Sequence, residues 1–156
     1  MSGDHSAAEV QIRDEGPMLV ASAVLAGCQP AAVLAAFTDP DLVRQWWRGE
    51  LTADLVPGGA YRVAFPAIPA TLTGAVVSFR PGDSLEFGWA WDGEADNPPS
   101  TVLVSVAPRA AASDSTVLTI EHGPHGDNEA GQTARTEHRE GWEYFLPRLV
   151  ETLTGT

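Results

Sequence analysis

Hydrophobic residues recur at three- and four-residue intervals from Asn128 to Leu153, with charged residues on the opposite side of the same period. This spacing predicts one apolar stripe along a helix with 3.6 residues per turn. Such a helix is stable only when its stripe is buried, so we expect it to pack on a sheet formed by the preceding strands. Pro147 interrupts the pattern and predicts a kink. The stripe comprises Trp142, Phe145, Leu146, Leu149, Val150 and Leu153.

The chain before this helix consists mainly of short runs of β-forming residues separated by Pro- and Gly-containing turns. We expect a first strand at Met18 to Ala26. Pro30 then begins a short helix to Phe37, and Pro40 begins a second through Trp47. Short turns between the later strands predict antiparallel neighbours. These strands are expected at Leu51 to Leu55, Ala60 to Phe65, Thr71 to Phe79, Ser84 to Trp91, Thr101 to Ala107 and Thr116 to His122.

One expected strand carries a row of large apolar side chains. Leu85, Phe87, Trp89 and Trp91 alternate with smaller or polar residues, so they share one face of the sheet. A face this rich in aromatic residues covers either a packed core or a lined cavity.

Composition restricts the setting of the protein. The 156 residues fit one domain, and a net charge of −12 argues against nucleic-acid binding. The single Cys28 cannot form an internal disulfide, and the N-terminus has no basic start or apolar h-region, which together favour the cytoplasm. No apolar run is long enough for membrane insertion. Residues 1–16 are polar and without periodicity, so we expect a flexible arm.

Several local motifs follow one another in a consistent order. They are Ala31-Ala32-Val33, Phe37-Thr38-Asp39-Pro40, Trp46-Trp47, Asp54 to Arg62, Gly74-Ala75-Val76, Leu85-Glu86-Phe87 with Trp89, Leu118-Thr119-Ile120, and His138 to Leu149. Together they resemble the activator of heat-shock protein 90 ATPase homologue family, in the START-like or SRPBCC superfamily. The resemblance implies a single START-like domain over residues 17–156. Its implied fold is the α+β helix-grip fold, a curved antiparallel sheet around a long C-terminal helix, with two short helices after the first strand.

The resemblance also implies a cavity between sheet and helix for a small hydrophobic or amphipathic ligand, such as a lipid, sterol or polyketide-like molecule. Gly141 is expected to let the helix approach the sheet closely. Ordinary core packing is the alternative for each aromatic residue taken alone. The expected ligand-binding residues are Trp46, Trp47, Tyr61, Phe65, Phe87, Trp89, Trp91, His122, Trp142 and Phe145.

Two chemical alternatives use polar residues. A cyclase- or hydrolase-type enzyme in the same cavity would draw on His122, Glu121, Arg62 and Tyr61. A metal centre would draw on His122, His125 and His138 with Glu121 and Glu137, but no ligand motif is present, so we predict no metal and no cofactor. Cys28 is expected to be a small buried hydrophobe rather than a nucleophile.

Partners and loops complete the predictions. A small apolar molecule is the expected partner; a homodimer stays open, and contact with a chaperone is the least favoured alternative. The acidic stretch from Asp92 to Pro99 is expected to be a solvated loop, with a lid at the cavity mouth as its alternative.

Overall fold

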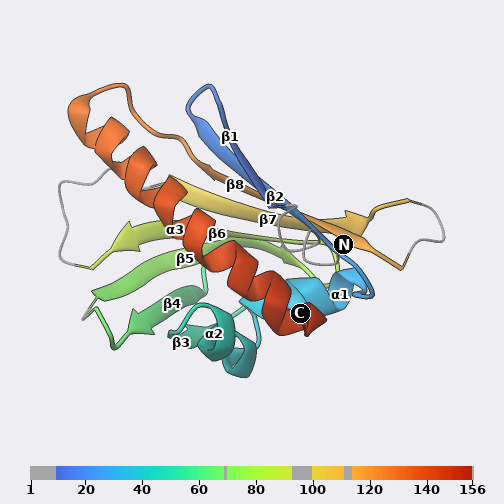
Figure 1. Ribbon diagram of the computed structural model, residues 1–156. Helices are drawn as coiled ribbons and strands as arrows, with labels where there is room; N and C mark the ends of the chain where they lie inside the picture. Colours follow the sequence, from blue (N-terminus) through green and yellow to red (C-terminus); the bar gives the residue numbers. More distant parts are fainter. Residues whose placement is uncertain (1–9, 69, 93–99, 111–113, 156) are drawn as a thin grey trace.

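The computed structural model describes residues 10–68, 70–92, 100–110 and 114–155. Within them, eight strands form one antiparallel sheet in the order β1-β2-β8-β7-β6-β5-β4-β3, which curves around the long helix α3 (Figure 1). This arrangement confirms the predicted helix-grip fold. The strands are β1 Gln11–Glu15, β2 Met18–Leu25, β3 Glu50–Ala53, β4 Ala60–Phe65, β5 Ala70–Arg80, β6 Ser84–Trp91, β7 Ser100–Pro108 and β8 Thr116–Gly123.

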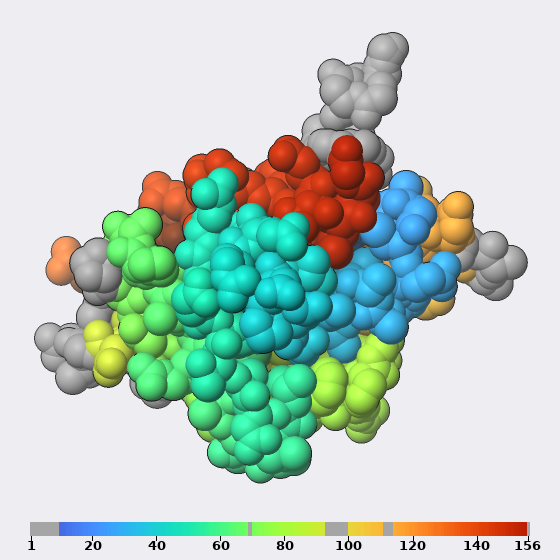
Figure 2. Space-filling model, turned by 90° about the horizontal axis from the view of Figure 1, so that it is seen from below, coloured from blue at the N-terminus to red at the C-terminus, as the bar shows by residue number. Residues whose placement is uncertain are grey.

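Three short helical segments carry the chain from β2 across to β3 at the far edge of the sheet. They are α1 (Pro30–Leu34), the 3₁₀ segment η2 (Ala35–Phe37) and α2 (Pro40–Trp46). Asp39 caps α2, because its carboxylate accepts a hydrogen bond from the Asp41 N–H at 2.9 Å. Figure 2 shows these segments, in blue to cyan, beside the red C-terminal end of α3, with which α2 is in contact. These segments close one end of the space between the sheet and α3.

Helix α3 (Glu129–Thr154) begins and ends where its sequence predicts. The Asn128 side chain accepts from the Gly131 N–H at 2.8 Å, and Gly155 ends the helix with a left-handed φ of 77°. Pro147 lies inside the helix, which continues to Thr154; the kink expected there stays a prediction. None of the helices in the described residues has the length and hydrophobicity that a bilayer span requires.

The expected flexible arm is wrong for Gln11–Glu15, which form β1 and pair with β2. Ion pairs hold this strand to α3, with Asp14 lying 3.0 Å from Arg135 and 3.2 Å from Arg139. The side-chain hydrogen bond from Arg135 is the largest influence lowering the pKa of Asp14, and Arg139 acts in the same direction. Long-range partners of this kind leave no local pattern in the sequence. Residues 1–9 lie outside the described residues.

The sheet bends where β5 passes β6. Their pairing shifts register between Val76 and Ser78, a β-bulge that increases local twist. Gly74 faces Gly88 so closely that a Cβ at Gly74 would collide with the Gly88 carbonyl. Glycine is therefore required at this crossing.

Candidate ligand-binding site

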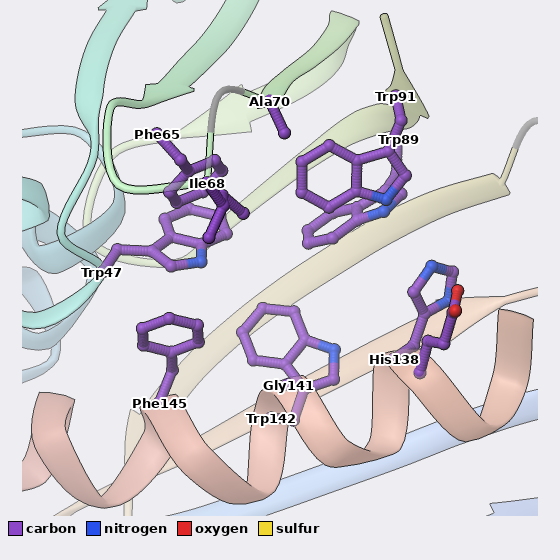
Figure 3. A pocket seen from close by; sticks show the side chains of 11 residues that line it. Trp47, Phe65, Ile68, Ala70, Trp89, Trp91, His138, Gly141, Trp142 and Phe145 are labelled. Carbon is purple, nitrogen blue, oxygen red and sulfur yellow. The ribbon is translucent and has the colours of Figure 1, made fainter. Parts of the chain in front are cut away.

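A cavity of about 310 Å³ lies between the sheet and the middle of α3. Figure 3 shows its two walls: side chains from the sheet side face His138, Gly141, Trp142 and Phe145 on the helix. Ile68, which is 59% exposed, also lines it, so the cavity opens to solvent on that side. The lining consists of Trp47, Phe65, Ile68, Ala70, Trp89, Trp91, Glu137, His138, Gly141, Trp142 and Phe145.

The same helix packs solidly at its other end. Leu146, Leu149 and Val150 are at most 2% exposed and belong to the hydrophobic core. Between Glu137 and Phe145, in contrast, the side chains of α3 border the cavity. The apolar stripe predicted from the sequence therefore serves two purposes, with core packing over the last turns and a cavity wall before them.

Four tryptophan rings belong to the wall. The Trp47 ring centroid lies 6.0 Å from those of Phe65, Trp89 and Trp142. Trp89 and Trp91 meet edge to face at 5.8 Å. Rings at these separations are in contact, so the wall is a continuous apolar surface on which a flat ligand can stack.

Six of the ten predicted ligand-binding residues line the cavity: Trp47, Phe65, Trp89, Trp91, Trp142 and Phe145. Their role as ligand contacts stays a prediction.

The structure places the other four predicted residues outside this lining. Trp46 donates its Nε1–H to the Ala36 carbonyl at 2.7 Å, and Phe87 stacks on Tyr61 at 4.0 Å. The Tyr61 hydroxyl donates to the Phe37 carbonyl at 2.6 Å. His122 does not line the cavity; its Nδ1 accepts a hydrogen bond from the Nε1–H of Trp142, which does. Alternation along a strand identifies which residues face inward, but not which end of the inner face is hollow.

The expected role of Gly141 in close helix–sheet packing is wrong. A Cβ added there would meet nothing within 4 Å, so glycine does not serve a close helix–sheet approach. Its missing side chain instead leaves space in the cavity.

Sequence reasoning also missed Ile68 and Ala70, and considered Glu137 and His138 in the metal alternative rather than as contacts of a small molecule. A signal for His138 was present, because a helical residue four positions before Trp142 lies on the same face of the helix as Trp142.

Three histidines gather beside the cavity, from the end of β8, the following loop and α3. One candidate ligand atom from each of His122, His125 and His138 lies within 4.8 Å of the others. His138 Nδ1 is 2.9 Å from His125 Nε2, and the His122 and His138 rings stack at 4.0 Å. A divalent metal would need a lone pair from each imidazole, and hydrogen bonds already engage several of these nitrogens.

Burial keeps these imidazoles neutral. Desolvation is the main cause that lowers the pKa of His122 well below its usual value, with the neighbouring histidines adding to it. Desolvation likewise lowers the pKa of His138 to about 4. The pKa of His125 is lowered for the same reason, against an opposing effect of its hydrogen bond to Pro17. At neutral pH the cluster therefore carries no charge.

The polar residues of the enzyme alternative do not converge. The Arg62 side chain is exposed on the strand that buries Tyr61, so the two point to opposite faces of β4. The Tyr61 hydroxyl is occupied by a backbone carbonyl. Burial raises the pKa of the Cys28 thiol, which fits the expected buried hydrophobe. The acidic stretch considered as a lid lies, after Asp92, outside the described residues.

The family model described as "Activator of Hsp90 ATPase homolog 1-like protein" matches residues 28–154. A comparison with curated proteins gives no match.

Solved structures share the fold. The solution structure of an Arthrobacter aurescens protein is 17% identical, with a TM-score of 0.76, and the match covers 95% of this chain and 93% of that one. Protein MLL2253 from Mesorhizobium loti is 19% identical, with a TM-score of 0.74 and coverage of 89% and 98%. DynU16, from the dynemicin biosynthetic locus, is 26% identical, with a TM-score of 0.74, covering 91% of this chain and 49% of DynU16.

Proposed function

Because this chain belongs to the family of Activator of Hsp90 ATPase homolog 1-like proteins, we propose that it binds a small hydrophobic or amphipathic molecule in the cavity between the sheet and α3. The observation that carries the proposal is the cavity itself, about 310 Å³ in volume and walled by six aromatic side chains. Known ligand pockets begin at about 300 Å³ and combine apolar walls with a few polar groups. The similarity to DynU16, described as a protein in the dynemicin biosynthetic locus, supports a ligand of the polyketide-like class among those considered.

Binding without turnover is favoured over the enzyme alternative. A catalytic base must be held against the substrate with a pKa near the working pH. His138 is the histidine that lines the cavity, and burial lowers its pKa to about 4, which makes it a weak base. The histidine of the cavity wall therefore favours binding over acid–base catalysis.

Native mass spectrometry of the purified protein, followed by calorimetric titration with sterols, fatty acids and polycyclic aromatic compounds, tests the proposal. We expect saturable one-to-one binding of at least one polycyclic compound, with a negative heat-capacity change from apolar burial. Absence of binding across all three classes contradicts it. Stimulation of a chaperone ATPase by a protein that binds none of them would favour the chaperone alternative instead.

A further inference from the structure

The aromatic cavity has a polar end. Figure 3 shows His138 at one end of the cavity and Trp47 with Phe145 towards the other. A side pocket of about 20 Å³ adjoins the main cavity, with which it shares Trp89, Trp91, Glu137 and His138. A space of this size holds one water molecule or a group of similar size. The side pocket therefore extends the cavity at its His138 end by the room that one small polar group needs.

Glu137 gives this end a negative charge. A surface carboxylate without a basic partner is ordinary in a chain with 21 acidic and 9 basic residues, but Glu137 lines both the main cavity and the side pocket. The two arginines nearest to it on α3, Arg135 and Arg139, are bound to Asp14 of β1 instead. In the described part of the chain, no arginine lines either space, so no protein cation there balances the carboxylate.

The other groups around Glu137 admit a positive charge. Burial lowers the pKa of His138 to about 4, so this imidazole is uncharged at neutral pH and does not repel a cation. Aromatic faces attract cations, and indole does so most strongly. An aromatic wall therefore accepts a positive group as well as an apolar one. The net charge of −12 further favours cations over anions near the protein.

The indole N–H groups at this end do not reverse the preference. Trp89 Nε1 is enclosed by protein atoms, so a ligand in the cavity does not reach it. Trp142 Nε1–H donates to His122 Nδ1 at 3.1 Å. Trp91 is partly exposed, so water can accept from its N–H. A hydrogen bond to an ionised group is about twice as strong as one between neutral groups, so the Glu137 carboxylate outweighs this neutral donor.

The charge of Glu137 discriminates among amphipathic ligands. A carboxylate, as in a fatty acid, would place two like charges together and find no cation in the lining. A protonated amine has three donors and no acceptor, so it matches a carboxylate. Glu137 is exposed, so the amine keeps part of its hydration there and the loss of solvation does not cancel the attraction.

We propose that the ligand is a cationic amphiphile, an apolar ring system that carries a protonated amine. Its rings fill the aromatic cavity, and its ammonium group lies in the side pocket against the Glu137 carboxylate. This inference rests on the proposed function and names the charge of the ligand.

Calorimetry at pH 7 with two naphthalene derivatives tests the charge. 2-Naphthylmethylamine and 2-naphthylmethanol share the ring system and the linker, but the first carries an ammonium group and the second a neutral hydroxyl. We expect wild-type protein to bind the amine about tenfold more tightly, a difference of about 1.4 kcal/mol. Glu137→Gln keeps the size of the side chain and removes its charge, so the preference should fall below about threefold. Circular dichroism checks that the variant is folded.

Glu140→Gln is the matched control, because Glu140 is exposed on the same helix, lines neither space and loses the same charge. It should keep the tenfold preference. If wild-type protein binds the alcohol as tightly as the amine, the inference is overturned and the proposed function stands. A preference that persists in Glu137→Gln, or that falls equally in Glu140→Gln, also overturns the inference, since the carboxylate at the cavity then does not select the ligand. Binding of neither compound counts against both proposals.

Discussion

A larger side chain in place of Gly141 can block the binding site without disrupting the fold. A Cβ there would meet nothing within 4 Å, and the residue lines the cavity. Gly141→Leu should therefore direct an apolar side chain into the cavity. Glycine in a helix interior is about 1 kcal/mol less favourable than alanine, and leucine is close to alanine. Burying roughly half of the leucine contributes about another 1 kcal/mol. We expect the variant to be about 2 kcal/mol more stable.

The melting temperature should rise accordingly by about 4–8 °C, since a domain of this size gains about 2–4 °C for each kcal/mol. Affinity for the polycyclic compound that the wild-type protein binds should fall at least about tenfold. At about 25 cal/mol per Å², a loss of about 60 Å² of apolar ligand contact is sufficient for that change. A variant that is more stable yet binds less cannot owe its defect to unfolding.

Glu140→Leu is the control, because Glu140 is exposed and lies one residue earlier in the same helix. It introduces the same side chain away from the cavity and should leave the dissociation constant within about twofold of wild type. Differential scanning calorimetry and isothermal titration supply the two readouts. If Gly141→Leu binds the polycyclic compound as tightly as wild type, the ligand does not occupy this cavity. A lower melting temperature would refute the inference that the space is empty.

Other measurements test the surroundings of the cavity. Trp142 Nε1–H can only donate and the Pro17 carbonyl can only accept, so NMR of the imidazole nitrogens at pH 7 should find the proton on Nε2 of His122 and on Nδ1 of His125 and His138. A proton on Nε2 of His138 would contradict these hydrogen-bond directions. Because the folded pKa of His138, about 4, lies below its unfolded value of 6.5, stability should fall as pH drops from 6.5 to 4, and less steeply in His138→Phe. Tyr61→Phe removes the hydroxyl that donates to the Phe37 carbonyl, and it should lower stability by about 1–3 kcal/mol with unchanged affinity for the polycyclic compound. Calorimetric titration with Zn²⁺ should give no saturable heat, whereas a one-to-one isotherm would make the histidines metal ligands.

The fold was predictable because its signals are local. Proline at the first position of α1 and α2, Asn128 before α3 and the glycines of the turns each determine an element boundary from nearby sequence. Strand β1 was missed because its stability depends on pairing with β2 and on ion pairs from Asp14 to α3. Such contacts join residues far apart in the chain, and no periodicity records them.

The site was predictable only as far as the inner face of the sheet. Alternation identified Phe87 and Trp89 equally, yet Phe87 packs on Tyr61 while Trp89 borders the cavity. Phe87 and Trp89 differ because α2 and the C-terminal turns of α3 fill the space between sheet and helix at one end, whereas the cavity lies at the other end. Side-chain volume summed over several elements decides this, and a single strand does not contain that information.

The hydrogen bond between His138 and His125 also depends on residues at the end of the segment that the sequence predicted to be a flexible arm. The Pro17 carbonyl lies between β1 and β2, where it accepts from both the backbone N–H and Nδ1 of His125. Arg135 of α3 donates to the adjacent Gly16 carbonyl at 2.8 Å and pairs with Asp14 on β1. The β1–β2 hairpin is therefore attached to α3 next to His138, and it orients His125, which in turn orients His138. A hairpin at the edge of the sheet thus orients a histidine of the cavity wall, although the hairpin itself does not line the cavity.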